Sequence, residues 1–243
     1  NDFRLDPNEL ADLITDRTRL VILNSPHNPT GGVLTEQDMR DIAEAIGDRD
    51  IMVFADEIYS RLVYEGEHFS IMSIDGWKER TVMLDGWSKS YAMTGWRLGY
   101  GVMRADLAEH FSKLMTNSNS CSAAFTQMAG LEAIRGNQQP VEEMAAEFKR
   151  RRVRFVEGIN KIKGFSARVP AGAFYVFPNI TQTGFNSKQL ADLLLEEAGV
   201  ACLAGTAFGK FGEGYLRFSI ANSTENLEKA LDRIENWTRK RLG

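Results

Sequence analysis

The sequence predicts an α/β fold with a mostly parallel sheet and flanking helices, followed by a smaller C-terminal α+β domain. Short apolar, β-branched runs such as RLVILNS and IMVFADE have the length and composition of buried strands. Segments with helical spacing separate these runs, and strands that alternate with helices imply crossover connections and a parallel sheet covered on both faces. Beyond Gly164 the predicted strands become shorter and more scattered, which indicates a second domain.

The first elements have clear start and stop signals. DPNELADLI is predicted to be a short helix, with Asp6 as its N-cap, Pro7 at the first helical position and Glu9 in the first turn. RLVILNS is then a buried strand that runs into the turn-rich PHNPTGG. Thr35 caps the next helix, which has apolar residues at helical spacing, and Gly47 ends it. IMVFADE, TVMLDGW and RLGYGVM follow as three further strands.

The second half begins with helices. DLAEHFSKLM and AAFTQMAGLEAIRG are predicted helices, and VEEMAAEFKRRRVRFVEGINKIKG is a long one that ends at Gly164. The smaller domain combines the strands ARVPAGAFYVFPN, VACLAG and GYLRFSIAN with the helices SKQLADLLLEEAG and STENLEKALDRIENWTRKRLG. We place the domain boundary within the long helix, so that residues 1–150 form part of a large domain and residues 151–243 form the small one.

Composition favours a small-molecule ligand. The 243 residues are 43% hydrophobic, enough for a sizeable core, and a net charge of -4 gives no electrostatic reason to expect nucleic acid or an anionic membrane as partner. Cys121 and Cys202 have no spacing typical of a disulfide framework or a metal site, so we expect no metal and a reducing cytoplasm. The sequence shows no apolar run long enough to span a bilayer and no signal peptide pattern.

Polar residues follow three predicted strands, in SPHNPTGG, DEIY and GWSKS. Ligands in open α/β sheets bind at the carboxyl ends of strands, so Asn28, Asp56, Tyr59 and Lys89 are expected to converge on one crevice. Each residue alone also fits an ordinary role: a turn for Asn28, a helix cap for Asp56 and the protein surface for Lys89. The combination carries the functional interpretation.

Together these residues describe a site for pyridoxal phosphate. A lysine in an apolar, glycine-rich setting such as that of Lys89 favours the neutral amine, which attacks carbonyl carbons to form a Schiff base. Asp56 has the charge needed to keep a pyridine nitrogen protonated. Ser88, Ser90 and Arg97 offer the hydroxyls and the guanidinium that a phosphate requires.

Five motifs in this order, NSPHNPTGG, FADEIYSRLVY, SKSYAMTGWRLGY, PAGAFYVFP and GYLRFSIANS, resemble the signatures of the fold-type I, class I/II pyridoxal-phosphate-dependent aminotransferases. The resemblance covers essentially the whole chain and is close to the bacterial aspartate aminotransferase branch. It implies that Lys89 forms the Schiff base with the cofactor and that Asp56 pairs with the pyridine nitrogen. Asn28 and Tyr59 would bind the phenolic oxygen, and Arg97 would bind the phosphate.

The same resemblance assigns Arg217 to the substrate α-carboxylate. In GYLRFSIAN, Leu216, Phe218 and Ile220 alternate with Arg217 and Ser219, so Arg217 faces away from the core if the first three face it. The planar fork of its guanidinium suits bidentate binding of a carboxylate.

Two departures from the family pattern stand out. Many members have a serine or threonine three residues before the lysine, whereas this chain has Gly86, for which Ser88 or Ser90 would compensate. The chain also starts at Asn1, and by the family layout it lacks roughly the first third, including the loop that cups the phosphate and the aromatic residue that stacks on the ring. We therefore expect a chain that carries the lysine but only half of the pocket.

The expected activity is transfer of an amino group between an L-amino acid and a 2-oxo acid by a ping-pong Schiff-base mechanism. Two alternatives remain open: a pyridoxal-phosphate-dependent carbon-sulfur β-lyase of the same fold, and an inactive aminotransferase-like binding or dimerisation module. A hydrolase with Ser88 as nucleophile is disfavoured, because GWSKS lacks the second glycine of a nucleophile elbow.

The substrate is left open by the sequence. Some dicarboxylate-specific relatives use a further arginine from the region after the lysine motif, and this chain has none between Arg104 and Arg135. Aspartate is therefore one candidate donor beside alanine, aromatic and methionine-type amino acids. The family also implies a homodimer in which two subunits complete each site.

Overall fold

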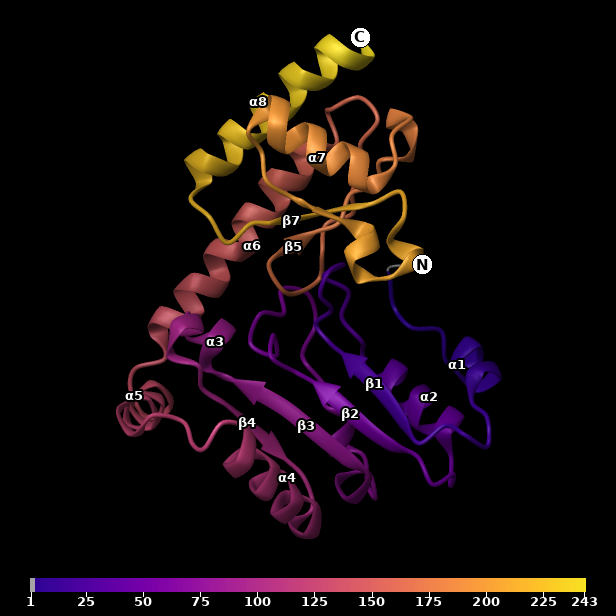
Figure 1. Ribbon diagram of the computed structural model, residues 1–243, viewed down its shortest axis with the longest axis vertical. Helices are drawn as coiled ribbons and strands as arrows, with labels where there is room; N and C mark the ends of the chain where they lie inside the picture. The colour runs from indigo at the N-terminus through magenta and orange to yellow at the C-terminus, as the bar shows by residue number, and fades with distance from the viewer. Residues whose placement is uncertain (1–2) are drawn as a thin grey trace. The chain divides into compact units, whose positions relative to one another are not determined.

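The computed structural model describes residues 3–243, which fall into two compact units (Figure 1). Unit 1 comprises residues 3–26 and 33–143, and unit 2 comprises residues 27–32 and 144–243. The predicted boundary between residues 150 and 151 lies inside helix α6, Gln139–Ile159, and stays a prediction. Within the described residues, no helix combines the length and the apolar character needed to cross a bilayer.

Unit 1 is built on a four-stranded sheet in the order β1-β2-β3-β4. Its strands are β1 Leu20–Asn24, β2 Met52–Asp56, β3 Thr81–Gly86 and β4 Gly99–Val102. The pairings β1 with β2 and β2 with β3 are parallel, and β4 runs antiparallel to β3, so the predicted mostly parallel sheet is confirmed. Its other elements are α1 Pro7–Leu13, α2 Glu36–Ile46, η1 Ile71–Ser73, η2 Lys78–Arg80, α3 Trp87–Ser90, η3 Thr94–Trp96, α4 Ala105–Ser118 and α5 Ala124–Arg135.

The residues predicted to begin and end the first two helices do so in α1 and α2. The Asp6 side chain accepts a hydrogen bond from the Asn8 amide, which caps α1 as predicted. Thr35 and Asp38 form a reciprocal capping box at the start of α2. Gly47, with φ of 58°, ends that helix in a conformation that glycine adopts at low cost.

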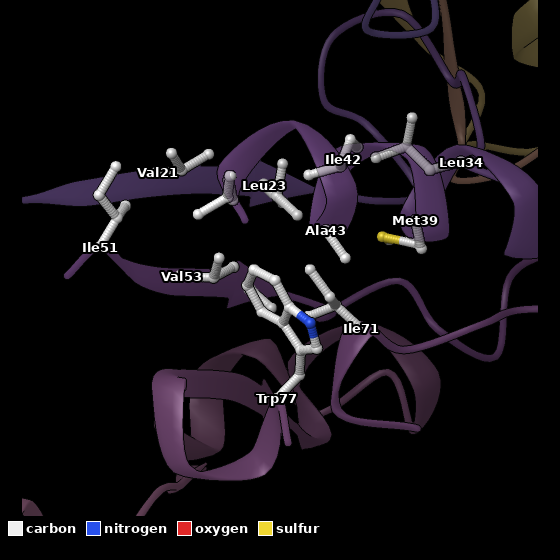
Figure 2. Close-up of a cluster of buried hydrophobic side chains, with 12 residues drawn as sticks. Val21, Leu23, Leu34, Met39, Ile42, Ala43, Ile51, Val53, Ile71 and Trp77 are labelled. Atoms are coloured by element: carbon white, nitrogen blue, oxygen red, sulfur yellow. The ribbon is translucent and has the colours of Figure 1, made fainter. Parts of the chain in front are cut away.

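The core of unit 1 lies between the sheet and α2 (Figure 2). Met39, Ile42 and Ile46 of α2 are at most 1% exposed and pack with strand residues such as Val53. The buried cluster consists of Val21, Leu23, Leu34, Met39, Ile42, Ala43, Ile46, Ile51, Val53, Ala55, Ile71 and Trp77. Burying this much apolar surface fixes the strand ends that carry the polar residues of the site.

The predicted coverage of both sheet faces is wrong for β1 within the described residues. Val21 and Leu23 are buried on one face, whereas Leu20 and Ile22 on the other face are 48% and 67% exposed. Side chains alternate between the two faces of a strand, so this pattern means that residues 3–243 cover only one face at β1.

Unit 2 packs helices against a small antiparallel sheet in the order β5-β7-β6. Its elements are β5 Tyr175–Val176, η4 Thr181–Thr183, α7 Ser187–Ala198, β6 Leu203–Ala204, η5 Gly205–Phe208, η6 Lys210–Gly212, β7 Leu216–Ser219 and α8 Thr224–Leu242. Phe155 of α6 packs against Phe218 of β7, with ring centroids 5.5 Å apart. A smaller α+β part therefore follows the parallel sheet, as the sequence predicts.

The long helix ends earlier than predicted. α6 stops at Ile159, and the chain continues to Gly164 as a tight turn in which the amides of Ile162 and Phe165 donate to carbonyls three residues back. These short-range bonds replace the spacing of the α-helix. Gly164, with φ of +87°, lies in this turn rather than at the helix end.

Candidate active site

Lys89 lies on the short helix α3, directly after β3, and is half-buried. The backbone is closely packed here: the Trp87 amide donates to the Leu98 carbonyl at 3.3 Å, and a Cβ at position 86 would lie 2.8 Å from the Gly99 Cα. Any side chain at residue 86 would therefore clash with backbone. This close approach accounts for the glycine at position 86 of this chain.

Asp56, Tyr59 and Lys89 come together in unit 1. The Lys89 Nζ lies 5.9 Å from the centroid of the Tyr59 ring, and Tyr59 is buried. Burial raises the pKa of Asp56, as does the charge of Glu57, while the Ile58 amide and the Lys89 ammonium lower it. The Asp56 Oδ1 accepts from the Ile58 amide at 3.2 Å, so Asp56 also caps the turn that follows β2.

Arg97 lies beside a surface pocket in the same unit. The pocket has a volume of about 660 Å³ and is lined by Ala92, Gly95, Trp96, Arg97, Met115, Asn119, Cys121, Ser122, Ala123, Phe125 and Thr126. Arg97 has φ of 52°, is exposed, and donates from Nη1 to the Thr94 carbonyl at 2.8 Å. Ser88 is half-buried on α3, and the Oγ of Ser90 is buried without a partner among residues 3–243.

Arg217 and Asn28 come together in unit 2. Leu216, Phe218 and Ile220 are at most 4% exposed, which confirms the predicted alternation along the strand. The Arg217 Nη1 donates to the Asn28 Oδ1 at 2.8 Å. Within the described chain the Arg217 Nε is buried and has no partner, so a donor remains open for an acceptor from a ligand.

Two aromatic rings hold the Arg217 guanidinium. Its Cζ lies 4.4 Å from the centroid of Tyr175 and 5.0 Å from that of Phe208. These cation–π contacts stabilise the positive charge of the group, while its N–H groups serve as hydrogen-bond donors. Neither ring was predicted to contact Arg217, although Tyr175 lies within the PAGAFYVFP motif.

The loop 27–32, which carries Asn28, packs within unit 2. The Gly31 amide donates to the His27 carbonyl at 2.8 Å, and the Gly172 amide donates to the Gly31 carbonyl at 2.9 Å. The His27 Nδ1 lies 2.8 Å from the Thr30 Oγ1, and burial lowers the pKa of His27. These bonds fix the backbone on either side of Asn28.

Residues 1–234 of this chain match the family described as aminotransferase class I and II. The chain belongs to this family. It is 42% identical to an aspartate aminotransferase of Pyrococcus abyssi, over 99% of this chain and 62% of that protein. It is also 42% identical to aromatic-amino-acid aminotransferase 2 of Thermococcus litoralis, over 97% of this chain and 61% of that protein.

Solved aminotransferase structures share the fold. The aromatic aminotransferase from Pyrococcus horikoshii OT3 superposes with a TM-score of 0.96 at 42% identity, covering 99% of this chain and 65% of that one. The aspartate aminotransferase from Rhizobium meliloti superposes with a TM-score of 0.92 at 35% identity, covering 98% and 62%. The chain thus spans about three fifths of the length of the relatives it matches.

Class I and II aminotransferases depend on pyridoxal phosphate, and the residues of unit 1 fit that cofactor. Lys89 presents a half-buried amine beside the Tyr59 ring. Asp56 is a carboxylate that burial has made costly to ionise, and a cationic ring nitrogen would offset that cost. The Ser90 hydroxyl is buried without a partner in the described chain, which suits an acceptor such as a phosphate oxygen.

Further polar residues near the site escaped the sequence analysis. Asp85, at the end of β3, accepts from the Ser60 Oγ at 3.1 Å and from the Gly86 amide at 2.6 Å, and burial raises its pKa. Glu57 is 6% exposed and contacts His68 and Ser70. Asp85 and Glu57 both lie at the ends of strands, and this position could have identified them from the sequence.

Proposed function

We propose that the whole protein is a pyridoxal-phosphate-dependent aminotransferase that moves an amino group between an L-amino acid and a 2-oxo acid. The observation that carries the proposal is the convergence of Asp56, Tyr59 and Lys89 in unit 1. When bound, pyridoxal phosphate supplies a carbonyl that condenses with amines and a protonated ring that takes up electrons from the substrate carbon.

Lys89 has two tasks in this proposal. Its Nζ is the group that would hold the cofactor through the carbonyl carbon, and it would become free when a substrate amine is bound there instead. The free Nζ would then accept the proton that leaves the substrate α-carbon and would donate it again later in the reaction. Its half-buried position beside the Tyr59 ring limits the water around the amine and fixes where it meets the cofactor.

Asp56 and Tyr59 hold the ring in this proposal. Asp56 keeps the pyridine nitrogen protonated, because its carboxylate lies in a partly buried setting where an opposite charge is strongly favoured. The Tyr59 hydroxyl would donate to the phenolic oxygen, a role that the family resemblance also gives to the Asn28 amide. Ser88 and Arg97 bind the phosphate, with the unpartnered Ser90 hydroxyl as a further donor.

Arg217 receives the substrate α-carboxylate. Its Nη1 is engaged by the Asn28 Oδ1, its faces are stacked, and its buried Nε lacks a partner in residues 3–243. A buried, unpaired donor of a charged group is costly, and a carboxylate oxygen would satisfy it. One amino acid enters and its 2-oxo acid leaves before a second 2-oxo acid accepts the amino group, which gives ping-pong kinetics.

The proposal extends to partner and compartment. We propose a homodimer, supported by large apolar side chains exposed on α4 and α5: Leu114, Phe125 and Met128 are each at least 65% exposed. We place the enzyme in the cytoplasm, supported by two cysteines that are both free. Aspartate and aromatic amino acids are the candidate donors suggested by the names of the relatives.

Borohydride trapping tests the proposal. The protein is mixed with pyridoxal phosphate, reduced, digested and mapped by mass spectrometry, beside a Lys89→Ala variant and a control with the exposed Lys188→Ala. We expect the reduced adduct on Lys89, its loss in Lys89→Ala and its retention in Lys188→Ala. Adducts spread over surface lysines, or turnover retained by purified Lys89→Ala, would refute the assignment of Lys89.

A further inference from the structure

Glu57 joins three segments at the edge of the sheet in unit 1. It follows Asp56 directly, and its amide donates to the Leu84 carbonyl of β3 at 2.9 Å. Its own carbonyl accepts from the Ser60 amide at 2.8 Å, inside the turn that carries Tyr59. The backbone of Glu57 therefore ties the end of β2 both to β3 and to the turn that follows.

The Glu57 side chain is also held in place, by burial and by two polar contacts. Its carboxylate is buried, with 7% of the side chain exposed. The Oε1 accepts from the Ser70 Oγ at 2.5 Å, and the Oε2 lies 2.7 Å from the His68 Nε2. The His68 Nδ1 is buried and has no partner within the described chain, so the Nε2 contact is the polar contact that holds the ring.

Burying the Glu57 carboxylate is costly, because removing a carboxylate from water costs several kcal/mol even when partners are present. Glutamate reaches both Ser70 and His68 at once, and both can donate to a carboxylate. Aspartate is one methylene shorter, and glutamine would present an N–H group to one of the two partners. A glutamate at this position can therefore accept from both partners at once.

We propose that Glu57 is the positioning residue of the candidate active site: its carboxylate, held by Ser70 and His68, fixes the turn from Asp56 to Tyr59 and keeps a second negative charge beside Asp56. The role toward the ring nitrogen rests on the proposed function. The contacts of Glu57 with Ser70 and His68 do not depend on the proposed function, so their effect on the turn and on Asp56 can be tested without cofactor.

The charged groups around Glu57 agree with this role. Besides burial, the Glu57 charge raises the pKa of Asp56 and of Asp85, and the His68 charge lowers that of Asp85. Lys89 acts on Asp56 in the opposite direction to Glu57. A cation placed at Asp56 would thus meet the field of two carboxylates rather than one, which strengthens its binding.

The test compares Glu57→Gln with Glu44→Gln, which removes a charge from an exposed position of α2. Carbon-13 NMR follows the Asp56 carboxyl through a pH titration, and amide hydrogen exchange reports on the turn from Asp56 to Tyr59. In Glu57→Gln we expect a lower pKa for Asp56 and faster exchange of the Ile58 and Ser60 amides. In Glu44→Gln we expect neither change.

A second variant keeps the proposal testable if Glu57→Gln does not fold. Ser70→Ala removes the 2.5 Å bond and leaves the charge in place. We expect amide hydrogen exchange at Ile58 and Ser60 to accelerate about tenfold or more, while the amides of α2 stay protected. Unchanged exchange in folded Ser70→Ala, or an unchanged Asp56 titration in folded Glu57→Gln, would overturn the proposal. Failure to trap an adduct on Lys89 would instead count against the proposed function.

Discussion

The Arg217 Nη1 donates a hydrogen bond of 2.8 Å to the Asn28 Oδ1 and joins two residues that lie 189 positions apart in the sequence. The bond fixes one edge of the guanidinium, while Tyr175 and Phe208 stack on the group. Arg217 is thus held in place before any substrate arrives. Such preorganisation lowers the entropy lost when a carboxylate binds.

Arg217→Lys should therefore weaken all amino-acid substrates together. A lysine keeps the positive charge but loses the planar fork, the bidentate geometry and the stacking. We expect kcat/KM to fall about 100-fold or more for alanine, aspartate and phenylalanine alike, which corresponds to one lost charge-assisted hydrogen bond with its stacking. A loss confined to one side-chain class would make Arg217 a specificity residue instead.

Phe208→Leu should act on the same carboxylate site more mildly. The substitution removes one stacked face from Arg217, and cation–π contacts contribute about 0.5–2 kcal/mol. We expect KM to rise about 3- to 10-fold for every amino acid, with kcat little changed. The matched control is Phe211→Leu, because Phe211 lies on the neighbouring η6 and is 88% exposed. Equal effects in both variants would contradict a specific role for Phe208.

Much of the site followed from local patterns. The apolar runs in the sequence indicated β1, β2 and β3. The turn residues after these strands indicated which polar side chains lie at the carboxyl edge of the sheet. The proximity of Asp56 and Lys89 was therefore predictable. The two-residue period of GYLRFSIAN also gave the outward direction of Arg217. These features depend on neighbours in sequence and on the topology of a parallel sheet.

Other features required tertiary structure. The rings on Arg217 come from β5 and η5, and no spacing in the sequence indicates which aromatic residues will stack on it. The contacts of Glu57 with His68 and Ser70 form across an irregular segment without periodicity. The exposure of Ile22 also escaped prediction, because an apolar strand residue indicates a buried face without showing what covers it.

Gly31→Ala should destabilise the loop that carries Asn28. Gly31 has φ of +71°, and a Cβ there would lie 2.3 Å from the Pro170 Cβ and 2.9 Å from the Gly172 carbonyl oxygen. Gly66→Ala is a matched control, because Gly66 has φ of +75° but no atom within 4 Å of the added Cβ. We expect a loss of about 1 kcal/mol for Gly66→Ala from backbone strain alone, and of about 2–4 kcal/mol for Gly31→Ala.

Chemical denaturation measures both glycine variants. The difference between them isolates the steric clash from the cost of a positive φ, since the two positions have similar φ values of +71° and +75°. Equal losses in the two variants would mean that the loop 27–32 moves away from Pro170 at little cost.

Asp56→Asn should stabilise the cofactor-free protein at neutral pH while it removes the proposed aminotransferase activity. Burial raises the pKa of Asp56 above its ordinary value of 3.8, so the folded state binds this proton more tightly than the unfolded chain does. The resulting stabilisation is fully present below pH 3.8 and is lost as the pH rises through the folded pKa. At pH 7 the ionised group opposes folding, and the uncharged amide relieves that cost while its Oδ1 still accepts from the Ile58 amide.

Thermal unfolding at several pH values checks this expectation. We expect the melting temperature of Asp56→Asn to exceed that of the unsubstituted protein at pH 7 by about 1–3 °C, a gap that closes as the pH approaches 3. The exposed Asp75→Asn is the matched control for a change of one charge, and its melting temperature should not follow this pattern. An Asp56→Asn variant that is less stable than the unsubstituted protein at pH 7 would show that Lys89 and the Ile58 amide outweigh burial at this carboxylate. The expected outcome would instead mark Asp56 as a residue whose charge is kept for function at the expense of stability.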